Sequence, residues 1–589
     1  MVHGLERLEY RGYDSAGILV GNETWAMKLI RAVGKVSNLA HKVTKEISDK
    51  ETFTFGIAHT RRATHGWVTE ENTHPHHDQN KHFYLVHNGI IENYHKLKQQ
   101  LIAKWYTFYG ETDSEVIANL LEDNRTGDFM QTVEKVLWII RWAYALLIVS
   151  TYAPDEIIAV KIWSPLLFAY NNNEYFFSSD KQALAGYADK LIYLDDGDIV
   201  HLKWSDYQIK SNGIPTQKKI EDMDMEALES SKWDYKHFML KEIFEQANII
   251  RRIFKGRVDF NKNFLNAEAF HGMEHEHFKK IVFVGCGTSY NAWCVWTYWM
   301  ENLAWLDSSC EIASEYEYKN IRVNDDTLYV FISQSGETAD SIEVLKLIKN
   351  KWWHTFGIVN VVGSTISRLT DYGLFTRWGA EIWVASTKAF TAQMTSILLL
   401  ALYLGQKRGL SKAKYDKVMI ELSKVPVMIE DLLADTVTIR KIAEEISGYK
   451  NFFFLGRQYQ LPIARESSLK LKEITYLHSE SYPSGELKHG PLALIDKSIP
   501  SVLFVPNDLM FEKNVSSIQE IKARDGKVIT ISDKEIHNAD WNIQVPSTID
   551  EIYPFLTAIV WQLLAYHVAD ILWKDIDKPR NLAKSVTVK

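Results

Sequence analysis

The chain has 589 residues, which exceeds a single hydrophobic core and predicts roughly two to four domains. Its 67 basic and 75 acidic residues give a net charge of −8 with no basic stripe or tail, so nucleic acid is not expected as a partner. No apolar run approaches the ~20 residues that cross a bilayer, and no signal peptide opens the chain. The three cysteines form neither a disulfide framework nor a metal-binding spacing. We therefore expect a cytoplasmic protein without membrane association.

Residues 1–210 contain four short apolar stretches that predict strands, and turn residues separate them. The stretches lie at 52–58, 83–87, 145–149 and 156–160. This pattern predicts an α+β sandwich. The composition then becomes polar and acidic, so residues 211–240 are expected to form a linker.

Two similar α/β units follow, at residues 241–425 and 426–575. In each unit a strand runs into a glycine-containing loop and a helix, first at 280–289 and again at 451–457. Alternating strands and helices then predict a doubly wound parallel sheet in each unit. Ligands bind such sheets at the carboxyl ends of the strands, where Ser289 and Ser333 would lie.

The segment that begins at Ser333 has the features of a phosphate cradle. An apolar strand at 327–332 ends in hydroxyl side chains and a glycine, and a helix follows. The first N–H groups of a helix are unsatisfied and its amino end is positive, so a phosphate monoester fits there. Ser335 and Thr338 would add hydroxyl donors, and Gly336 would let the backbone approach the ligand. No lysine follows the glycine as in a nucleotide P-loop, which favours a small phosphorylated metabolite over ATP. The alternative is a helix N-cap with nothing bound.

A second candidate group lies in the last unit. Lys470 and Glu473 are three residues apart in a helical stretch, so their side chains share one face. Glu473 is a candidate general base, and His489, in a loop of glycine and proline, is a candidate proton carrier; both suit proton transfer on a sugar. The alternatives are a solvated salt bridge for the Lys–Glu pair and a structural hydrogen bond for His489. Spacing alone leaves the two interpretations even.

Five motifs after residue 240 resemble the glutamine:fructose-6-phosphate aminotransferase family, whose product is glucosamine 6-phosphate. The motifs are Cys286–Asn291, Ser333–Thr338, Val384–Phe390, Gly485–Leu494 and Pro579–Val588. The resemblance covers almost the whole chain. It implies that the units at 241–425 and 426–575 are sugar-isomerase (SIS) domains and that residues 576–589 form an active-site tail.

The resemblance also implies roles for individual residues. Glu473 would move the proton between C1 and C2 of the sugar, and His489 would assist ring opening. Lys584 would form a Schiff base with the ketose, assisted by Lys470. A lysine nucleophile must be neutral part of the time, which desolvation in a closed pocket promotes. The sugar phosphate would be held by Thr288, Ser289, Ser333, Gln334, Ser335, Thr338, Val384, Ser386 and Ala583.

Residues 1–210 resemble the class II, N-terminal-nucleophile (Ntn) glutaminase of the same family. The matching motifs are Tyr10–Gly17, Ala58–Arg61, Ala63–Gly66, His87–Asn93 and Glu111–Asp113. The resemblance implies that Asn88 and Gly89 form an oxyanion hole. The α-carboxylate and α-amino groups of glutamine would be held by Arg61, Thr64, His65 and Asp113.

The sequence departs from the family at the glutaminase nucleophile, which is an N-terminal cysteine. This chain starts within what is the first helix of the family, and its cysteines, Cys286, Cys294 and Cys310, all lie in the first SIS unit. The chain as written is therefore expected to lack glutaminase activity. Arg62 stands where the family has a tryptophan that gates the ammonia path.

Tryptophan stands at eight positions where the family pattern has glycine. Glycine marks positions that need a positive φ or a close backbone approach, and a large side chain suits neither. The 29 glycines make up about 5% of the chain, below the usual ~7%. We hypothesise that the gene uses UGA for glycine and was translated with UGA as tryptophan; the alternative is drift in a decaying paralogue. UGG codons would contradict the hypothesis at these positions: Trp67, Trp105, Trp142, Trp163, Trp293, Trp305, Trp383 and Trp573.

The predicted function is that of a transferase that converts fructose 6-phosphate and glutamine into glucosamine 6-phosphate and glutamate. No metal or organic cofactor is implied, and a homodimer is expected. One alternative is an ammonia-dependent synthase or a sugar-phosphate isomerase; another is a non-catalytic module that senses sugar phosphates. The set Lys470, Glu473, His489 and Lys584 argues against the sensor, which needs only the Ser/Thr cradle.

Overall fold

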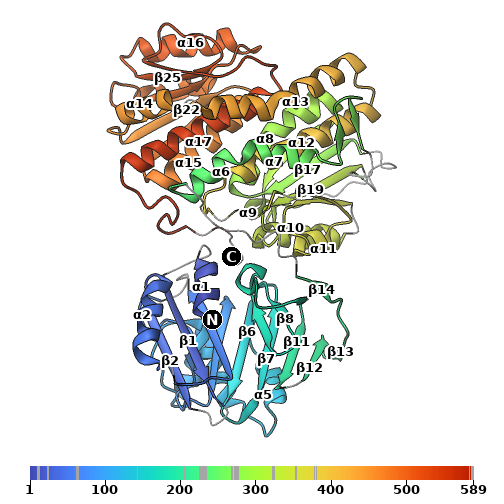
Figure 1. Cartoon of the computed structure of the whole chain (residues 1–589), viewed down its shortest axis with the longest axis vertical. Helices are drawn as coiled ribbons and strands as arrows, with labels where there is room; N and C mark the ends of the chain where they lie inside the picture. The colour runs from blue at the N-terminus through green and yellow to red at the C-terminus, as the bar shows by residue number, and fades with distance from the viewer. Residues whose placement is uncertain are drawn as a thin grey trace. The chain divides into compact units, whose positions relative to one another are not determined.

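The computed structural model forms two compact units, one within residues 1–229 and the other within residues 230–584 (Figure 1). It describes residues 1–9, 14–22, 26–48, 50–61, 66–141, 143–204, 206–223, 235–266, 270, 278–321, 326–351, 354–376, 378–379, 381, 383–434, 436–582 and 584.

Unit 1 consists of antiparallel strands with helices packed on the sheets. Its helices are α1 (Val2–Leu8), α2 (Val36–Glu46), α3 (Tyr94–Ala103), α4 (Asp113–Asp123) and α5 (Phe129–Leu137). Its strands are β1 (Ser15–Gly21), β2 (Met27–Val33), β3 (Phe55–Arg61), β4 (His76–His77), β5 (Phe83–Gly89), β6 (Tyr144–Ser150), β7 (Ala153–Ile162), β8 (Leu167–Tyr170), β9 (Tyr175–Ser178), β10 (Lys190–Tyr193), β11 (Asp198–Lys203), β12 (Asp206–Ser211), β13 (Ile214–Pro215) and β14 (Glu221–Asp222).

The sheets of unit 1 pack face to face. A three-stranded sheet has the order β2-β1-β3, and a seven-stranded sheet has the order β13-β12-β11-β7-β6-β5-β4. Leu19 and Ile57 of the small sheet pack with Val86 and Val149 of the large one, so buried apolar side chains fill the space between the sheets. This arrangement confirms the predicted α+β sandwich. The stretch predicted as a linker contains β13 and β14, and its residues 224–234 lie outside the described part of the chain.

Unit 2 contains two parallel sheets of five strands each. The first is made of β17 (Lys280–Gly285), β18 (Asp307–Ile312), β19 (Thr327–Ser333), β20 (Thr355–Val359) and β21 (Tyr372–Phe375), in the order β18-β17-β19-β20-β21. The second is made of β22 (Asn451–Gly456), β23 (His478–Pro483), β24 (Ser501–Phe504), β25 (Val528–Ser532) and β26 (Trp541–Gln544), in the order β23-β22-β24-β25-β26. Both sheets have the doubly wound order, which confirms the prediction. The strand order reverses between β17 and β19, and this reversal opens a crevice at their carboxyl ends.

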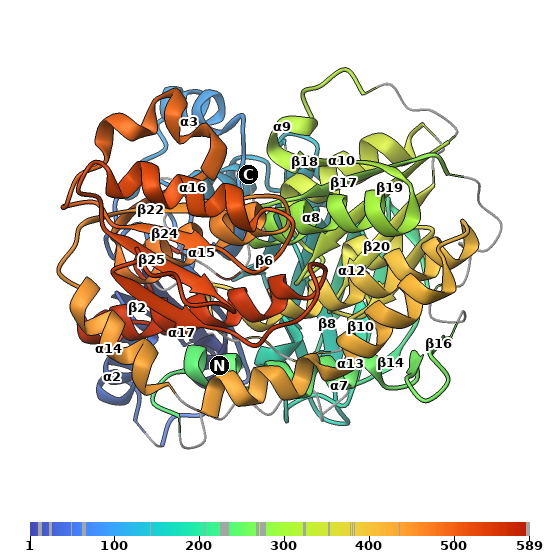
Figure 2. The same cartoon turned by 90° about the horizontal axis from the view of Figure 1, so that it is seen from above.

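Helices pack between and around the two parallel sheets (Figures 1 and 2). α8 contacts both α12 and α15, and α15 contacts α17, so the two sheets share one continuous apolar core. By length and composition α12 and α17 could span a membrane, but 94% and 89% of their most apolar stretches are buried in the protein. Their apolar side chains therefore serve the core.

The α-helices of unit 2 are α6 (Phe238–Phe244), α7 (Gln246–Phe254), α8 (Gly287–Trp299), α9 (Ala313–Tyr316), α10 (Ala339–Lys349), α11 (Thr365–Leu369), α12 (Lys388–Lys407), α13 (Lys412–Ala434), α14 (Val437–Ile446), α15 (Gln460–Thr475), α16 (Phe511–Lys522) and α17 (Tyr553–Ile571). A small two-stranded sheet, made of β15 (Val258–Asp259) and β16 (Phe264–Leu265), lies between α7 and α8 in the sequence.

Four of the eight tryptophans that replace expected glycines occupy the left-handed backbone region. Their φ angles are 71° at Trp105, 65° at Trp163, 50° at Trp305 and 53° at Trp573. Trp105 is the second residue after α3, and the N–H of the next residue donates to the carbonyl of Leu101 at 3.1 Å. This is the Schellman ending of a helix, in which glycine is the usual residue.

Trp573 ends α17 with the same Schellman pattern, because Lys574 N donates to the carbonyl of Ala569 at 3.0 Å. Trp67, Trp293 and Trp383 are not among the described residues with positive φ, and Trp142 lies outside the described part of the chain. The left-handed backbone therefore accounts for four of the eight positions, and the codon hypothesis stays a prediction.

Trp105→Gly is expected to raise the free energy of unfolding by roughly 1–2 kcal/mol, because a side chain in the left-handed region costs about that much. The indole is 91% exposed, so its removal costs little packing. Trp138→Gly is the matched control: it lies in the same unit, is 90% exposed, and has an ordinary φ of −72°. Calorimetric melting of both variants should show a higher midpoint only for Trp105→Gly. Equal destabilisation of the two variants would contradict the assignment.

Candidate active site

A loop rich in hydroxyl groups connects β19 to α10 in unit 2. β19 ends at Ser333, and Thr338 is the N-cap of α10. The Ser333 Oγ lies 2.8 Å from the Thr338 Oγ1 and accepts a hydrogen bond from the Gly336 N–H at 3.0 Å. The Ser335 Oγ accepts from the Glu337 N–H at 3.1 Å. The loop therefore gathers three hydroxyl groups at the positive end of an eleven-residue helix, an arrangement that binds phosphate.

Gly336 is required by the packing behind this loop. Its φ is 69°, and a Cβ atom there would lie only 2.0 Å from the Ser364 Oγ. The next residue, Glu337, accepts hydrogen bonds from the N–H and Oγ1 of Thr365, at 2.7 and 2.8 Å, at the start of α11. The loop is therefore held from behind by the neighbouring helix.

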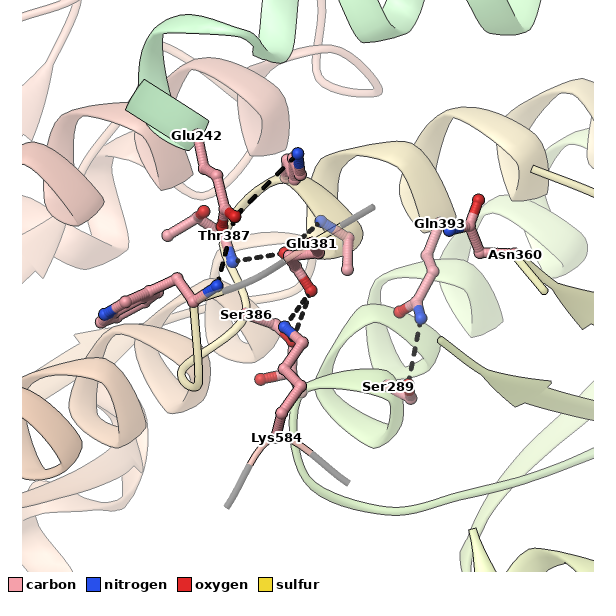
Figure 3. A network of polar contacts seen from close by, with 12 residues as sticks. Glu242, Ser289, Asn360, Glu381, Ser386, Thr387, Gln393 and Lys584 are labelled. Carbon is pink, nitrogen blue, oxygen red and sulfur yellow. Dashed lines mark hydrogen bonds and ion pairs between the residues drawn. The ribbon is translucent and has the colours of Figure 1, made fainter. Parts of the chain in front are cut away.

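The first turn of α8 lies at the carboxyl end of β17, next to β19. Thr288 Oγ1 donates to Glu466 Oε1 at 2.9 Å. Ser289 Oγ accepts from Gln393 Nε2 at 3.1 Å (Figure 3). Both residues lie at the strand-order reversal of the sheet, where a ligand was predicted to bind. Gln334, in the neighbouring loop, is half-buried.

Lys584, the last residue of unit 2, forms an ion pair with a buried carboxylate. Its Nζ donates to Glu381 Oε2 and, at 3.2 Å, to the Ser386 Oγ (Figure 3). The Lys584 side chain is 2% exposed and that of Glu381 is 0% exposed. Val384, which was also predicted to bind the sugar phosphate, is buried and lies three residues after Glu381 in the sequence. Ala583, from the same predicted set, lies outside the described residues.

A lysine and two glutamates form a buried cluster on α15. The Lys470 Nζ lies 2.5 Å from Glu473 Oε2 and 3.4 Å from Glu466 Oε1. The Lys470 side chain is 1% exposed, so this is not the solvated salt bridge considered as the alternative. Burial opposes the charge of Lys470, but Glu473 and Glu466 hold its pKa above the ordinary value. Glu381 contributes to the same shift, so the charges of the Lys584 pair and of the α15 cluster interact.

His489 is not brought into this cluster. It is exposed at the end of a 3-10 helix, Ser484–His489, where the sequence predicted a rigid loop. Within the described part of the chain it makes no recorded hydrogen bond, ion pair or ring contact.

Three polar residues of the site were missed by the sequence analysis: Glu381, Gln393 and Glu466. Glu466 had one available signal, because it lies one turn before Lys470 on the same helix face. Glu381 and Gln393 had no such signal in the sequence, since Lys584 and Ser289, which they contact in the site, are 203 and 104 residues away.

Unit 1 contains a cavity of about 880 Å³. Arg61, Asn88, Gly89 and Asp113 line it, so the structure brings together the described residues predicted to bind glutamine. A Cβ atom on Gly89 would lie 2.1 Å from the carbonyl oxygen of Ala143, so only glycine fits there. Arg62, Thr64 and His65 lie outside the described residues.

The cavity also has a buried histidine wall that the sequence analysis did not identify. The rings of His59 and His74 lie 4.3 Å apart, and both residues line the cavity. Burial, with the charges of His87 and Arg61, lowers the pKa of His59 to about 3, so this histidine is neutral near pH 7. Burial also lowers the pKa of Arg61, while Asp14 and Asp113 oppose that shift. A guanidinium is not deprotonated in proteins, so Arg61 remains a cation in the cavity that the neutral His59 also lines.

Comparisons with known proteins agree along the whole chain. A glutamine amidotransferase domain model matches residues 59–186, and a SIS domain model matches residues 276–403 and 445–571. Glutamine–fructose-6-phosphate aminotransferase (isomerizing) of Chlorobaculum tepidum is 39% identical over 601 residues, covering 100% of this chain and 97% of that protein. The enzyme of the same name from Aquifex aeolicus is 40% identical over 590 residues, covering 99% of this chain and 97% of that protein.

A solved structure agrees with unit 2. The C-terminal domain of glucosamine-fructose-6-phosphate aminotransferase from Francisella tularensis shares 40% identity and a TM-score of 0.55, and the match covers 59% of this chain and all of that domain. The amidotransferase match lies in the unit with the 880 Å³ cavity, and the two SIS matches contain the two parallel sheets. With this order of domains and about 40% identity over nearly the full length of its relatives, the chain belongs to the glutamine–fructose-6-phosphate aminotransferase (isomerizing) family.

Proposed function

We propose that this protein converts fructose 6-phosphate and glutamine into glucosamine 6-phosphate and glutamate. The observation that carries the proposal is the buried amine of Lys584 and its pairing with Glu381. The charge of Glu381 also helps to raise the pKa of Lys470, which belongs to the Lys470–Glu473 cluster. An amine, a general base and a hydroxyl-lined phosphate loop in one unit suit the amination and isomerisation of a ketose phosphate.

The proposed reaction in unit 2 begins with the sugar phosphate on the Ser333–Thr338 loop. Lys584 forms a Schiff base at C2 of the open-chain ketose, and ammonia then replaces the lysine nitrogen. Glu473 moves a proton between C1 and C2, which completes the conversion of a ketose into an aldose. Lys470, whose Nζ lies 2.5 Å from Glu473 Oε2, would position that carboxylate for the transfer.

The proposed role of unit 1 is to bind glutamine in the 880 Å³ cavity. Arg61 and Asp113 would hold the charged ends of glutamine, and Asn88 and Gly89 would stabilise the oxyanion. Hydrolysis also needs a nucleophile, and the cysteines of this polypeptide, 286, 294 and 310, all lie in unit 2.

The function is tested by supplying fructose 6-phosphate with either ammonium or glutamine and measuring glucosamine 6-phosphate by chromatography. Product formed with either nitrogen donor would support amination in unit 2, and product formed with glutamine would also support the proposed role of unit 1. Glu473→Gln is the matched control, because it keeps the size of the side chain and removes the base; its rate should fall on the order of 10²-fold or more. Undiminished product formation by Glu473→Gln would remove Glu473 from the proposed chemistry.

We also propose that the protein acts as a homodimer. The support is His489, which is exposed at the end of a 3-10 helix although ring opening calls for a proton carrier. A second copy could supply this histidine. Mixing inactive Glu473→Gln with inactive His489→Asn polypeptides should then restore activity, because hybrid pairs contain one intact site.

A further inference from the structure

Glu381 is a fully buried carboxylate whose hydrogen bonds hold both of its oxygens in place. Oε1 accepts from the backbone N–H groups of Thr387 and Ala389, at 3.2 and 3.0 Å, at the start of α12. Oε2 accepts from the Ser386 Oγ at 3.2 Å and from the Lys584 Nζ (Figure 3). One oxygen therefore anchors the carboxylate to the backbone, while the other faces the lysine nitrogen.

The electrostatic surroundings keep Glu381 ionised while Lys584 is its partner. Burial alone would raise the pKa of Glu381, but the Lys584 ammonium and the Ala389 N–H hold it below the ordinary value, helped by Lys388. Lys388 is itself paired with Glu245 at 2.9 Å, and Lys470 with Glu473 at 2.5 Å, so each of these cations has its own carboxylate. Glu381 is thus the carboxylate in contact with the Lys584 nitrogen among the described residues.

We propose that Glu381 is the proton acceptor and donor for Lys584 during Schiff-base formation. It takes the proton that the Lys584 ammonium must lose before its nitrogen attacks C2 of fructose 6-phosphate. It then returns that proton to the hydroxyl group that leaves as water. The proposal rests on the proposed function, in which Lys584 is the nucleophile.

The proton count of this step closes without another reactant. The ammonium gives one proton to the carboxylate, the neutral nitrogen forms a C–N bond to C2, and one of its two remaining protons moves to the C2 oxygen, which becomes a hydroxyl. The protonated Glu381 donates to that hydroxyl, the C–O bond breaks, and water leaves. The products are a protonated Schiff base and an ionised Glu381, so the net charge is unchanged.

Burial acts in favour of this proton transfer, against the attraction between the Lys584 ammonium and Glu381. In water the ion pair of a lysine and a carboxylate lies far below the neutral pair, but removing both groups from water penalises the charged form of each. With side chains 2% and 0% exposed, Lys584 and Glu381 are both shielded. The protonated Schiff base that results keeps a positive charge opposite Glu381, so the carboxylate also stabilises the product.

The test measures the rate at which fructose 6-phosphate becomes attached to Lys584, by borohydride quenching and peptide mass spectrometry, between about pH 6 and pH 9. In the wild type this rate should change little with pH, because the proton acceptor is internal. In Glu381→Gln it should fall on the order of 10²-fold at neutral pH and then rise about tenfold per pH unit, since solvent must deprotonate Lys584. Glu381→Asp keeps a carboxylate and should retain the flat profile at a lower rate.

Glu551→Gln is the control, because Glu551 is a buried carboxylate in the same unit that pairs with Lys414 at 2.5 Å. Its rate and pH profile should match the wild type. A Glu381→Gln variant with the wild-type rate and a flat profile would overturn the proposal. If Glu381→Gln fails to fold, a steep profile in Glu381→Asp would overturn it equally. Absence of any adduct on Lys584 in the wild type would instead refute the proposed Schiff base.

Discussion

Replacing Lys584 by arginine is expected to abolish the borohydride-stable attachment of fructose 6-phosphate and to lower amination on the order of 10³-fold or more. A guanidinium keeps the positive charge that faces Glu381, so the buried carboxylate stays compensated. It does not form a stable imine and stays protonated at every accessible pH, so the covalent route is closed. Mass spectrometry of the quenched protein measures attachment, and product chromatography measures amination.

The matched control for this prediction is Lys388→Arg. Lys388 is a second buried lysine close to Glu381, and its Nζ pairs with Glu245 Oε2 at 2.9 Å. Attachment of the sugar should persist in Lys388→Arg at the mass of the peptide that contains Lys584. Attachment that survives in Lys584→Arg would assign the nucleophile to another lysine.

Removing the three hydroxyl groups of the phosphate loop is expected to raise the KM for fructose 6-phosphate on the order of 10³-fold. The variant is Ser333→Ala, Ser335→Ala and Thr338→Ala combined. A hydrogen bond to a charged group contributes roughly 1.5–3 kcal/mol, and the three are not additive because the hydroxyl groups contact one another. The backbone N–H groups of α10 remain, so some phosphate binding should persist.

The same kinetic measurement needs a control for loss of a hydroxyl group near the loop. Ser367→Ala serves, because its Oγ donates to the Ser364 carbonyl on α11 at 2.8 Å and is not among the three loop hydroxyls. Its KM should equal that of the wild type. A triple variant with an unchanged KM would place the phosphate elsewhere in the protein.

The sequence alone determined the parts of the protein that depend on neighbouring residues. The alternation of apolar strands and helices predicted two doubly wound sheets, because periodicity follows from which side of an element is buried. The hydroxyl-rich loop was also predictable, since the six residues Ser333–Thr338 form it by local backbone geometry between one strand and one helix. Lys470 and Glu473 were placed on one helix face for the same reason.

The tertiary structure alone decided what depends on distant segments. Glu381 and Lys584 are 203 residues apart, and nothing in either local sequence indicates that they meet. The burial of Lys470, which separates a catalytic candidate from a solvated ion pair, comes from packing around α15 and not from the spacing of its residues. The left-handed φ at Trp105 and Trp573 likewise follows from how α3 and α17 end. Sequence periodicity records which residues are buried, but desolvation and pairing of charges arise only when separate segments exclude water together.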